Sequence, residues 1–571
     1  MSETSDSQAR RIRRFGNASL VVFAIACACV VQSPQWAQTS YYLLTQSLAS
    51  GTATIDNHHW QTGDKSWYQG HYYSVKAPGM SLVLVPPFAL LRSVGLNPGN
   101  STSAERHSKA GLKRSKRMMA PRPAWAREEV RRERWMIWAL GLIGTVTPAF
   151  GLLWLLRKEA ELLVPGTGTV SAMTVGLGTM ILPFATQLFG HLMGAFFLFL
   201  SFHLLMRERR GDPSWKLLLF AGLAAGVAIV VEYPMAFGGM ALGVYAMLRD
   251  PKELATAVRR AMAYGGGALV GLIPLGIYNL AVFGSLTHLS YSGAVAVEGK
   301  SGHAKLGLND SGFFGIGIPR PMAFVDVLFS PRGLLTAAPV CLLGFIGLLW
   351  MRRERQHKAE AWTALAVVGV YIFYVSGYWL PFGGGSPGPR FLVVTLPFLG
   401  LGMPFVWRRI PSATAFLAAV SATVMAVATI AEPLVTRHTI SLWGNRLLGA
   451  PGFKSLFNLV GFPLGAGSAI PVLLLLIGSA VLAGFATRVS GFGTRSDLKV
   501  AFAALVSWLL VALLISPAIG EQEIDPGLPA VGLPGDAVGL PANLVLIASL
   551  VGVAAVVVPL LLTRQDRSSL S

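Results

Sequence analysis

Residues 15–31, FGNASLVVFAIACACVV, contain no charged side chain and follow a basic segment with Arg10, Arg11, Arg13 and Arg14. A run of this length is long enough to cross the hydrocarbon core of a bilayer as a helix. Arginines that flank a first span stay in the cytoplasm, so the chain leaves this helix on the opposite side. A cleaved secretory signal shows the same order of features. We interpret the run as an uncleaved first transmembrane helix, and both alternatives give the same topology for the rest of the chain.

Similar runs recur throughout the 571 residues, which are 53% hydrophobic and only 13% charged, with a mean hydropathy of +0.55. The sequence therefore predicts an all-α, polytopic integral membrane protein with about fourteen transmembrane helices. After the first span, the predicted spans are residues 135–156, 168–186, 190–206, 217–231, 235–248, 262–282, 333–351, 361–379, 391–407, 412–431, 468–487, 499–518 and 541–562.

The net charge of +20 does not indicate nucleic-acid binding. The basic residues lie in short clusters between apolar runs, as they do in the cytoplasmic loops of membrane proteins. The three cysteines, Cys27, Cys29 and Cys341, all lie in apolar segments. They therefore indicate neither a disulfide framework nor a thiolate metal site.

The run at residues 80–95 decides the orientation of everything that follows it. It is short and contains Pro86, Pro87 and Arg92. If it does not cross, seven later basic clusters fall in the cytoplasm, and only the basic insertion at 97–134 remains outside. We therefore predict an interfacial or re-entrant helix. The predicted organisation is a cytoplasmic N-terminus (1–14), the first span (15–31), an extracytoplasmic loop (32–134), a transmembrane core (135–410) and C-terminal spans (411–571).

The extracytoplasmic loop contains residues 55–79, IDNHHWQTGDKSWYQGHYYSVKAPG. Carboxylates, histidines, lysines, tryptophans and tyrosines crowd together here, in a chain that is otherwise poor in charge. A site for a sugar and a phosphate needs aromatic faces, a base and cations together. The insertion at 97–134 is polar and basic, and we expect no packed core in it.

Asp56 and Asp64 are the candidate catalytic groups, because either carboxylate could act as general base toward an acceptor hydroxyl. Asp56 is preferred, since Asp64 could instead be the N-cap of a short helix that starts in GDKSWY. His58 and His59, with the aspartates, could bind a divalent metal, although their spacing is not that of a known metal motif. No cofactor is otherwise indicated.

Lys76 and Arg390 are candidates for holding a phosphate, because each lies in a turn with glycine at a predicted membrane boundary. Arg390 opens an apolar helix and could instead be an interfacial anchor. Arg332, in FSPRGLL, has the same two interpretations. The remaining candidate substrate-binding residues are Lys65, His71, Tyr72, His191 and Glu232, the last two at predicted helix ends on the outer side.

Several motifs together resemble the GT-C superfamily of bacterial membrane glycosyltransferases, a group similar to protein O-mannosyltransferases and lipid A aminoarabinose transferases. They are TxDKxxYxGHYYSxKAPGxSLxxxP from Thr62, the FGH turn, the EYP break, FSPRGLL and GGGSPGPRFL, and they cover roughly residues 10–410. The resemblance implies a long first outer loop with juxtamembrane helices in a protein of the bacterial inner membrane. It also implies inverting transfer of a sugar from a polyprenyl-phosphate donor to a glycan, lipid or protein acceptor on the extracytoplasmic side.

This sequence departs from that family at two places. No acidic residue lies between Gln32 and Ile55, where relatives carry one soon after the first helix, and Val75 stands where relatives have aspartate before the lysine of the KAPG turn. Two other functions therefore remain open. A lipid or solute transporter or flippase would place ionisable residues in mid-helix. A non-catalytic relative would lack an outer cavity suited to a sugar phosphate.

Overall fold

The computed structural model describes residues 2–95, 124–249, 253–295, 316–431, 433–434, 453–490 and 497–516. The predicted span at 541–562 and most of the insertion at 97–134 lie outside these residues. The exception is 124–134, which begins helix α5 (Ala124–Gly141).

The all-α membrane class is confirmed, whereas the number of spans is not. Eight helices in the described residues are long and apolar enough to cross a membrane, or up to 10 helical spans if each of two bent pairs counts as one. Several predicted spans are instead short helices, because the chain breaks within or between them. Residues 168–186 form α7 (Gly168–Gly178) and α8 (Ile181–Ala185), and the EYP break separates α10 (Trp215–Val231) from α11 (Met235–Met247).

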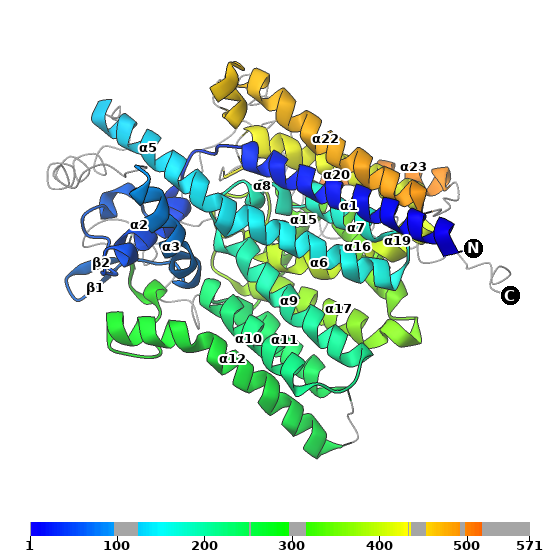
Figure 1. Cartoon of the computed structure of the whole chain (residues 1–571), viewed down its shortest axis with the longest axis horizontal. Helices are drawn as coiled ribbons and strands as arrows, with labels where there is room; N and C mark the ends of the chain where they lie inside the picture. The colour runs from blue at the N-terminus through cyan, green and yellow to red at the C-terminus, as the bar shows by residue number, and fades with distance from the viewer. Residues whose placement is uncertain are drawn as a thin grey trace.

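The other main helices are bundled around one another (Figure 1). They are α1 (Ser2–Cys29), α6 (Thr147–Leu163), α9 (Gly190–Arg210), α12 (Leu254–Phe283), α14 (Pro321–Phe329), α15 (Leu334–Ala337), α16 (Val340–Met351), α17 (Lys358–Gly377), α18 (Leu396–Gly400), α19 (Met403–Arg409), α20 (Pro411–Ala431), α22 (Ala466–Val489) and α23 (Leu498–Leu510). Two π-helical segments adjoin these helices. One is η3 (Leu142–Val146), between α5 and α6, and the other is η8 (Val511–Ile515), after α23. Short 3-10 segments are η1 (His59–Gln61), η4 (Ser290–Gly293), η5 (Arg355–His357), η6 (Arg390–Thr395) and η7 (Leu456–Val460).

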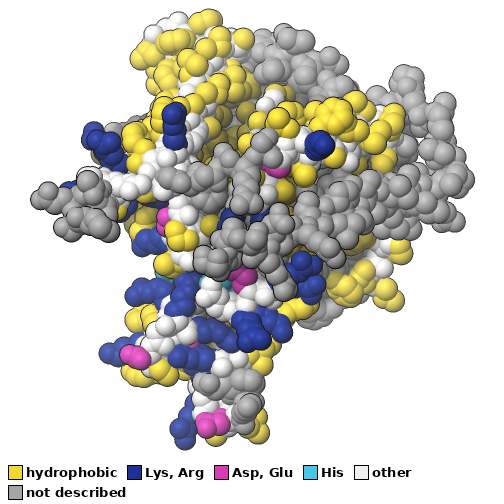
Figure 2. Space-filling model, turned by 90° about the vertical axis from the view of Figure 1, so that its right-hand side faces the viewer, with side chains coloured by type: hydrophobic (Ala, Val, Ile, Leu, Met, Phe, Trp, Pro, Cys, Tyr) yellow, Lys and Arg dark blue, Asp and Glu magenta, His cyan; other side chains and the backbone are white. Residues whose placement is uncertain are grey.

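The bundle has two chemically different ends. Helix α9 begins beside His191 and carries three arginines in its last turn, so these groups are about 25 Å apart along the helix. The end with the arginines, here called the basic end, is the one that Figure 2 shows, with dark-blue Lys and Arg side chains gathered on it. Its arginines are fixed by buried carboxylates: Arg210 lies 2.7 Å from Glu159, and Arg260 lies 2.7 Å from Glu208.

The opposite end carries a small sheet and two helices, at the left of Figure 1. Strands β1 (Lys65–Tyr68) and β2 (His71–Ser74) form an antiparallel hairpin, and β3 (Ala294–Val295) pairs with the free side of β1. The turn residues Gln69 and Gly70 have φ of +46° and +88°. Two positive-φ residues between aromatic strands are typical of a tight hairpin. The alternative of a short helix starting in GDKSWY is therefore wrong.

Helices α2 (Trp36–Ala49) and α3 (Gly79–Ser93) hold this hairpin against the bundle. The Ser40 hydroxyl on α2 donates to the Asp64 carbonyl over 2.6 Å and lies 2.8 Å from the Ser74 hydroxyl. Helix α3 coincides with the run at 80–95, and its 15 residues are too few to cross a bilayer core of about 30 Å. Its interfacial position stays a prediction. We call this end of the bundle the hairpin end.

Glycines bring α10 and α12 into very close contact. A Cβ at Gly222 would lie 1.8 Å from the Tyr264 carbonyl oxygen, and one at Gly267 would lie 2.0 Å from the Leu219 carbonyl oxygen. Helix pairs in membranes use small residues four apart in this way, because backbone-to-backbone packing replaces the missing hydrophobic driving force.

Candidate functional site

An ion pair between Asp64 and Lys76 lies at the base of the hairpin. Asp64 immediately precedes β1 and Lys76 follows shortly after β2, so the register that pairs Lys65 with Ser74 brings the two side chains together. Their charged atoms lie 2.6 Å apart, and the side chains are 22% and 14% exposed. The Lys76 ammonium also lies 5.8 Å from the centre of the Tyr41 ring. The carboxylate is thus partly accessible and already beside a cation.

Glu232 forms a second acidic position, in the EYP break between α10 and α11. Its carboxylate accepts a 2.6 Å hydrogen bond from the Tyr41 hydroxyl and lies 3.2 Å from Nδ1 of His191. Burial raises the pKa of Glu232, but His191, the Tyr41 hydroxyl and Lys76 outweigh that effect and hold the pKa at about 2. These partners therefore favour the charged form of Glu232.

Arg390 lies over a pocket that Glu232 and His191 also line, together with Met235, Tyr371 and Phe391. Its guanidinium is 5.6 Å from the centres of both the Phe189 and the Phe391 rings. In the described part of the chain, buried Nε of Arg390 and buried Nε2 of His191 make no hydrogen bond. The Arg390 Nε–H is thus an unused donor, whereas Nε2 of His191 accepts when Nδ1 donates to Glu232 and donates only in the doubly protonated ring.

The GGGSPG loop makes room for Arg390. Gly383 has φ of +72°, and a Cβ there would lie 2.5 Å from Nε of Arg390. The loop itself is held by Arg332, which is 1% exposed and donates to the carbonyl oxygens of Gly384 and Ser386 over 3.1 and 3.2 Å. The contacts of Arg332 therefore position the loop that precedes Arg390.

Asp56 and His71 lie apart from this group, on the outer side of the hairpin. The Asp56 carboxylate is 2.7 Å from Nδ1 of His71 and accepts a 2.6 Å hydrogen bond from the Tyr72 backbone N–H. Their side chains are 37% and 55% exposed. The described contacts join neither of them to Lys76 or Arg390. The sequence preference for Asp56 over Asp64 thus finds no support in the geometry.

Lys65, His59 and Tyr72 pack together beneath the hairpin. Lys65 is 5% exposed, and its ammonium donates to the His59 carbonyl oxygen over 3.0 Å and lies 3.1 Å from Nδ1 of the same residue. The His59 ring stacks on Tyr72 at 4.0 Å between centroids. Burial, and then the charge of Lys65, lower the pKa of His59 to about 4. All three side chains are engaged in holding the hairpin together.

The structure gives no support to a metal site at His58 and His59. Among the described residues, no group of three or more His, Cys, Asp or Glu side chains is placed to hold a metal ion. His59 turns inward to Lys65 and Tyr72, as just described, and does not converge with Asp56 and Asp64. A metal requirement remains open to experiment.

Sequence reasoning missed several hydroxyl groups around the site. The Tyr41 hydroxyl connects α2 to Glu232, and the Ser290 hydroxyl donates to the Lys76 carbonyl oxygen over 3.2 Å. Tyr291 and Tyr378 pair through their hydroxyls at 3.2 Å. Tyrosines next to apolar residues read as ordinary packing or an interfacial belt, and only the fold shows which of them reach the charged groups.

No protein-family model and no curated protein matches this sequence. Among solved structures, ArnT from Cupriavidus metallidurans bound to undecaprenyl phosphate is similar at a TM-score of 0.49 and 15% identity, over 87% of this chain and 79% of ArnT. The archaeal oligosaccharyltransferase AglB from Archaeoglobus fulgidus, in complex with an inhibitory peptide and a dolichol-phosphate, is similar at 0.40 and 12% identity, over 87% of this chain and 58% of AglB. Likeness at this level assigns neither a family nor a substrate to this chain.

Proposed function

We propose that the protein is a membrane glycosyltransferase that moves a sugar from a polyprenyl-phosphate donor to an acceptor hydroxyl. The observation that carries the proposal is the convergence, at one end of the bundle, of an accessible carboxylate with two cations. Asp64 is paired with Lys76, whose ammonium lies over the Tyr41 ring. The Tyr41 hydroxyl binds Glu232, which lines the same pocket as Arg390. An anion that bridges Lys76 and Arg390 would be bound beside a carboxylate able to accept a proton.

The mechanism assigns one role to each group. The donor phosphate displaces Asp64 as the partner of Lys76 and is also held by Arg390. The freed Asp64 carboxylate takes the proton of the acceptor hydroxyl, whose oxygen attacks the anomeric carbon. The bond from that carbon to the phosphate oxygen breaks, and Lys76 and Arg390 stabilise the charge on the departing phosphate. Glu232, held by Tyr41 and His191, keeps the pocket electronegative enough to retain both cations.

We propose that the hairpin end faces the extracytoplasmic side of a bacterial inner membrane. Cytoplasmic loops of membrane proteins carry the excess of Lys and Arg, and the basic end of this bundle carries the arginine clusters. On that orientation a nucleotide-sugar of the cytoplasm does not reach the site, whereas a lipid-linked donor in the outer leaflet does.

A transporter or flippase is less well supported by the same geometry. His191 is the second residue of α9, and Glu232 follows the last residue of α10, so both lie at helix ends. A transport pathway would place such groups near the middle of the helices.

The first experiment measures binding of undecaprenyl phosphate to the purified protein in lipid nanodiscs. We expect saturable binding by the wild type and at least about tenfold weaker binding by Lys76→Ala and by Arg390→Ala, because each loses a charge-assisted contact. Arg92→Ala is the matched control, since Arg92 is an exposed arginine in the last turn of α3. A wild type that fails to bind would overturn the proposal.

A second assay supplies undecaprenyl-phosphate-linked sugars with candidate hydroxyl acceptors and follows the release of undecaprenyl phosphate. Running it with EDTA and with added Mg²⁺ or Mn²⁺ decides whether a divalent metal is needed. Binding of the lipid phosphate without any transfer, across donors and acceptors, would favour the non-catalytic alternative.

A further inference from the structure

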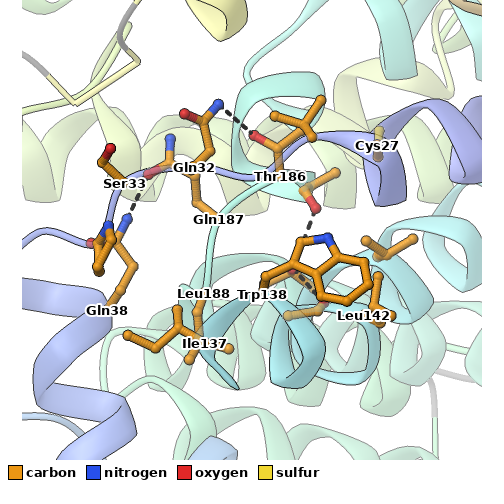
Figure 3. Close-up of a pocket in the computed structure, with 16 residues that line it drawn as sticks. Cys27, Gln32, Ser33, Gln38, Ile137, Trp138, Leu142, Thr186, Gln187 and Leu188 are labelled. Atoms are coloured by element: carbon orange, nitrogen blue, oxygen red, sulfur yellow. Dashed lines mark hydrogen bonds between the residues drawn. The ribbon is translucent and has the colours of Figure 1, made fainter. Parts of the chain in front are cut away.

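A second pocket opens beside the candidate site, between the end of α1, the start of α2, the α5 and η3 segment and the turn before α9 (Figure 3). Its interior volume is about 20 Å³, room for about one water-sized or hydroxyl-sized group, and it opens onto the protein surface. In Figure 3, Gln32, Ser33 and Gln187 lie in the upper part of the view with Gln38 below them at the left, and Ile137, Leu142 and Leu188 lie in the lower part. The pocket therefore has a polar wall and an apolar wall.

The polar wall contains one unused donor. Gln38 is 1% exposed and donates from its amide to Oε1 of Gln187 over 2.7 Å. Gln187 is 3% exposed, and in the described residues its Nε2 group has no hydrogen-bond partner. A buried amide N–H₂ without an acceptor is costly to the fold. It calls for an oxygen of a bound molecule.

The lining indicates the chemistry of that molecule, because none of the residues that line the pocket is charged. Gln32 donates to the Thr186 hydroxyl over 3.3 Å, and Trp138 donates to the Ala28 carbonyl oxygen over 2.9 Å, so these polar groups are neutral and largely satisfied. Arg134 lies at the rim, where its guanidinium donates to the Ser33 hydroxyl over 2.7 Å. An uncharged group with hydroxyl oxygens fits this wall better than a phosphate does.

The flanking helices show how a lipid would reach the pocket. Ile25 on α1 is 47% exposed and Ile143 on η3 is 42% exposed, so apolar faces on both sides of the pocket point out of the protein. The η3 segment is a π-helical turn, with the Thr145 hydroxyl donating to the Gly141 carbonyl oxygen over 2.7 Å. Such π-helical turns are frequent at functional sites. An alkyl chain could lie on this apolar side while its head group reaches Gln187.

Two segments connect the pocket with the candidate site, although no described residue lines both cavities. Gln38 and Tyr41 are three residues apart and therefore on the same face of α2. The segment from Gln187 to His191 runs from one cavity to the other, and Phe189 between them stacks against Arg390. A short stretch of chain thus joins the pocket to the surroundings of Arg390.

We propose that this pocket is the acceptor subsite and takes the uncharged, hydroxyl-bearing head group of a membrane lipid. The acceptor role rests on the proposed glycosyltransferase function, whereas the binding of a neutral lipid does not. One hydroxyl of the head group would occupy the pocket and accept from Gln187, with the rest of the head group at its mouth.

The test uses a photoreactive monoglucosyl diacylglycerol in phosphatidylcholine nanodiscs that contain the full chain. Mass spectrometry then locates the cross-linked peptides. We expect labelling of residues 27–38, 137–146 or 185–188, and competition by unlabelled monoglucosyl diacylglycerol but not by phosphatidic acid. Gln187→Leu should reduce labelling about fivefold, the value of a typical hydrogen bond. Gln46→Leu, on the same helix as Gln38 but outside the pocket, should leave it unchanged.

A second variant guards against an effect on folding. A Cβ at Gly141 would meet nothing closer than the Thr145 hydroxyl at 3.7 Å, so Gly141→Ala should occupy part of the small pocket without a steric clash and reduce the labelling. Labelling elsewhere, or equal competition by phosphatidic acid through Arg134, would overturn the proposal. Undecaprenyl phosphate binding should be unchanged in both pocket variants. A wild type that does not bind undecaprenyl phosphate would instead overturn the proposed glycosyltransferase function. The two assays therefore distinguish failure of the lipid pocket from failure of the proposed function.

Discussion

The Asp64 carboxylate lies 2.6 Å from the Lys76 ammonium across the base of the hairpin, while Asp56 pairs with His71 on the outer side. Two carboxylates eight residues apart thus have different surroundings. Only Asp64 belongs to the group of charges that continues through Lys76 to Glu232 and Arg390.

Separate substitution of the two aspartates tests this difference. Asp64→Asn should lower the rate of sugar transfer by about 10²-fold or more, because loss of a general base has that effect. Asp56→Asn should keep transfer within a fewfold of wild type, since it removes only the contact with His71 and weakens that with the Tyr72 N–H. Rates are compared at equal amounts of folded protein. The reverse order of effects would return the catalytic role to Asp56.

The hydrogen bond from Tyr41 to Glu232 should couple α2 to the EYP break. Tyr41→Phe and Glu232→Gln should each lower the free energy of unfolding, and the double variant should lose about 1–3 kcal/mol less than the sum of the two. Thermal or denaturant unfolding in detergent micelles measures the coupling. Tyr233→Phe combined with Glu232→Gln is the control, because the Tyr233 hydroxyl lies 3.2 Å from Ser290 instead. Additive effects in the first pair would mean that the bond contributes nothing.

Close packing of α10 on α12 predicts a sharp contrast between neighbouring glycines. Gly267→Ala should lower the free energy of unfolding by about 1–3 kcal/mol, since its Cβ would overlap the Leu219 carbonyl. Gly265→Ala on the same helix should be neutral or slightly stabilising, because a Cβ there meets nothing within 4 Å. The free energies of unfolding of both variants, measured in the same detergent, test this contrast. Equal stability of the two would show that the helices are not packed this closely.

The fold class could be predicted from the sequence because apolar runs of membrane-spanning length indicate transmembrane helices, and basic clusters between them indicate cytoplasmic loops. It also selected the turns with Lys76 and Arg390, whose glycines and cations are visible locally. The choice between Asp56 and Asp64 depended on the register of a hairpin that lacks the usual Asn-Gly turn, and the role of Tyr41 depended on helix packing. Long-range geometry of this kind has no local signal. Val75 shows the same limit, since Lys76 finds its carboxylate at Asp64 even though position 75 offers none.

His59 should make the hairpin sensitive to mild acid. Its pKa is about 4 in the folded protein against an ordinary value of 6.5, because burial and Lys65 disfavour its charged form. Between these two pH values the unfolded chain binds more protons, so stability should be complete above pH about 6.5 and fall by at most about 3 kcal/mol as the pH drops toward 4. Melting temperatures in micelles from pH 7 to pH 4.5 measure this loss.

His59→Asn is the informative variant, because an amide oxygen can replace Nδ1 as the partner of Lys65 without titrating. Its melting temperature should fall less steeply with decreasing pH than that of the wild type, even if its stability at neutral pH is lower. Replacing the exposed His71 with asparagine provides the matched control and should leave the wild-type slope in place. If His59→Asn keeps the full slope while His71→Asn flattens it, the acid sensitivity belongs to the Asp56 side of the hairpin and not to its buried core.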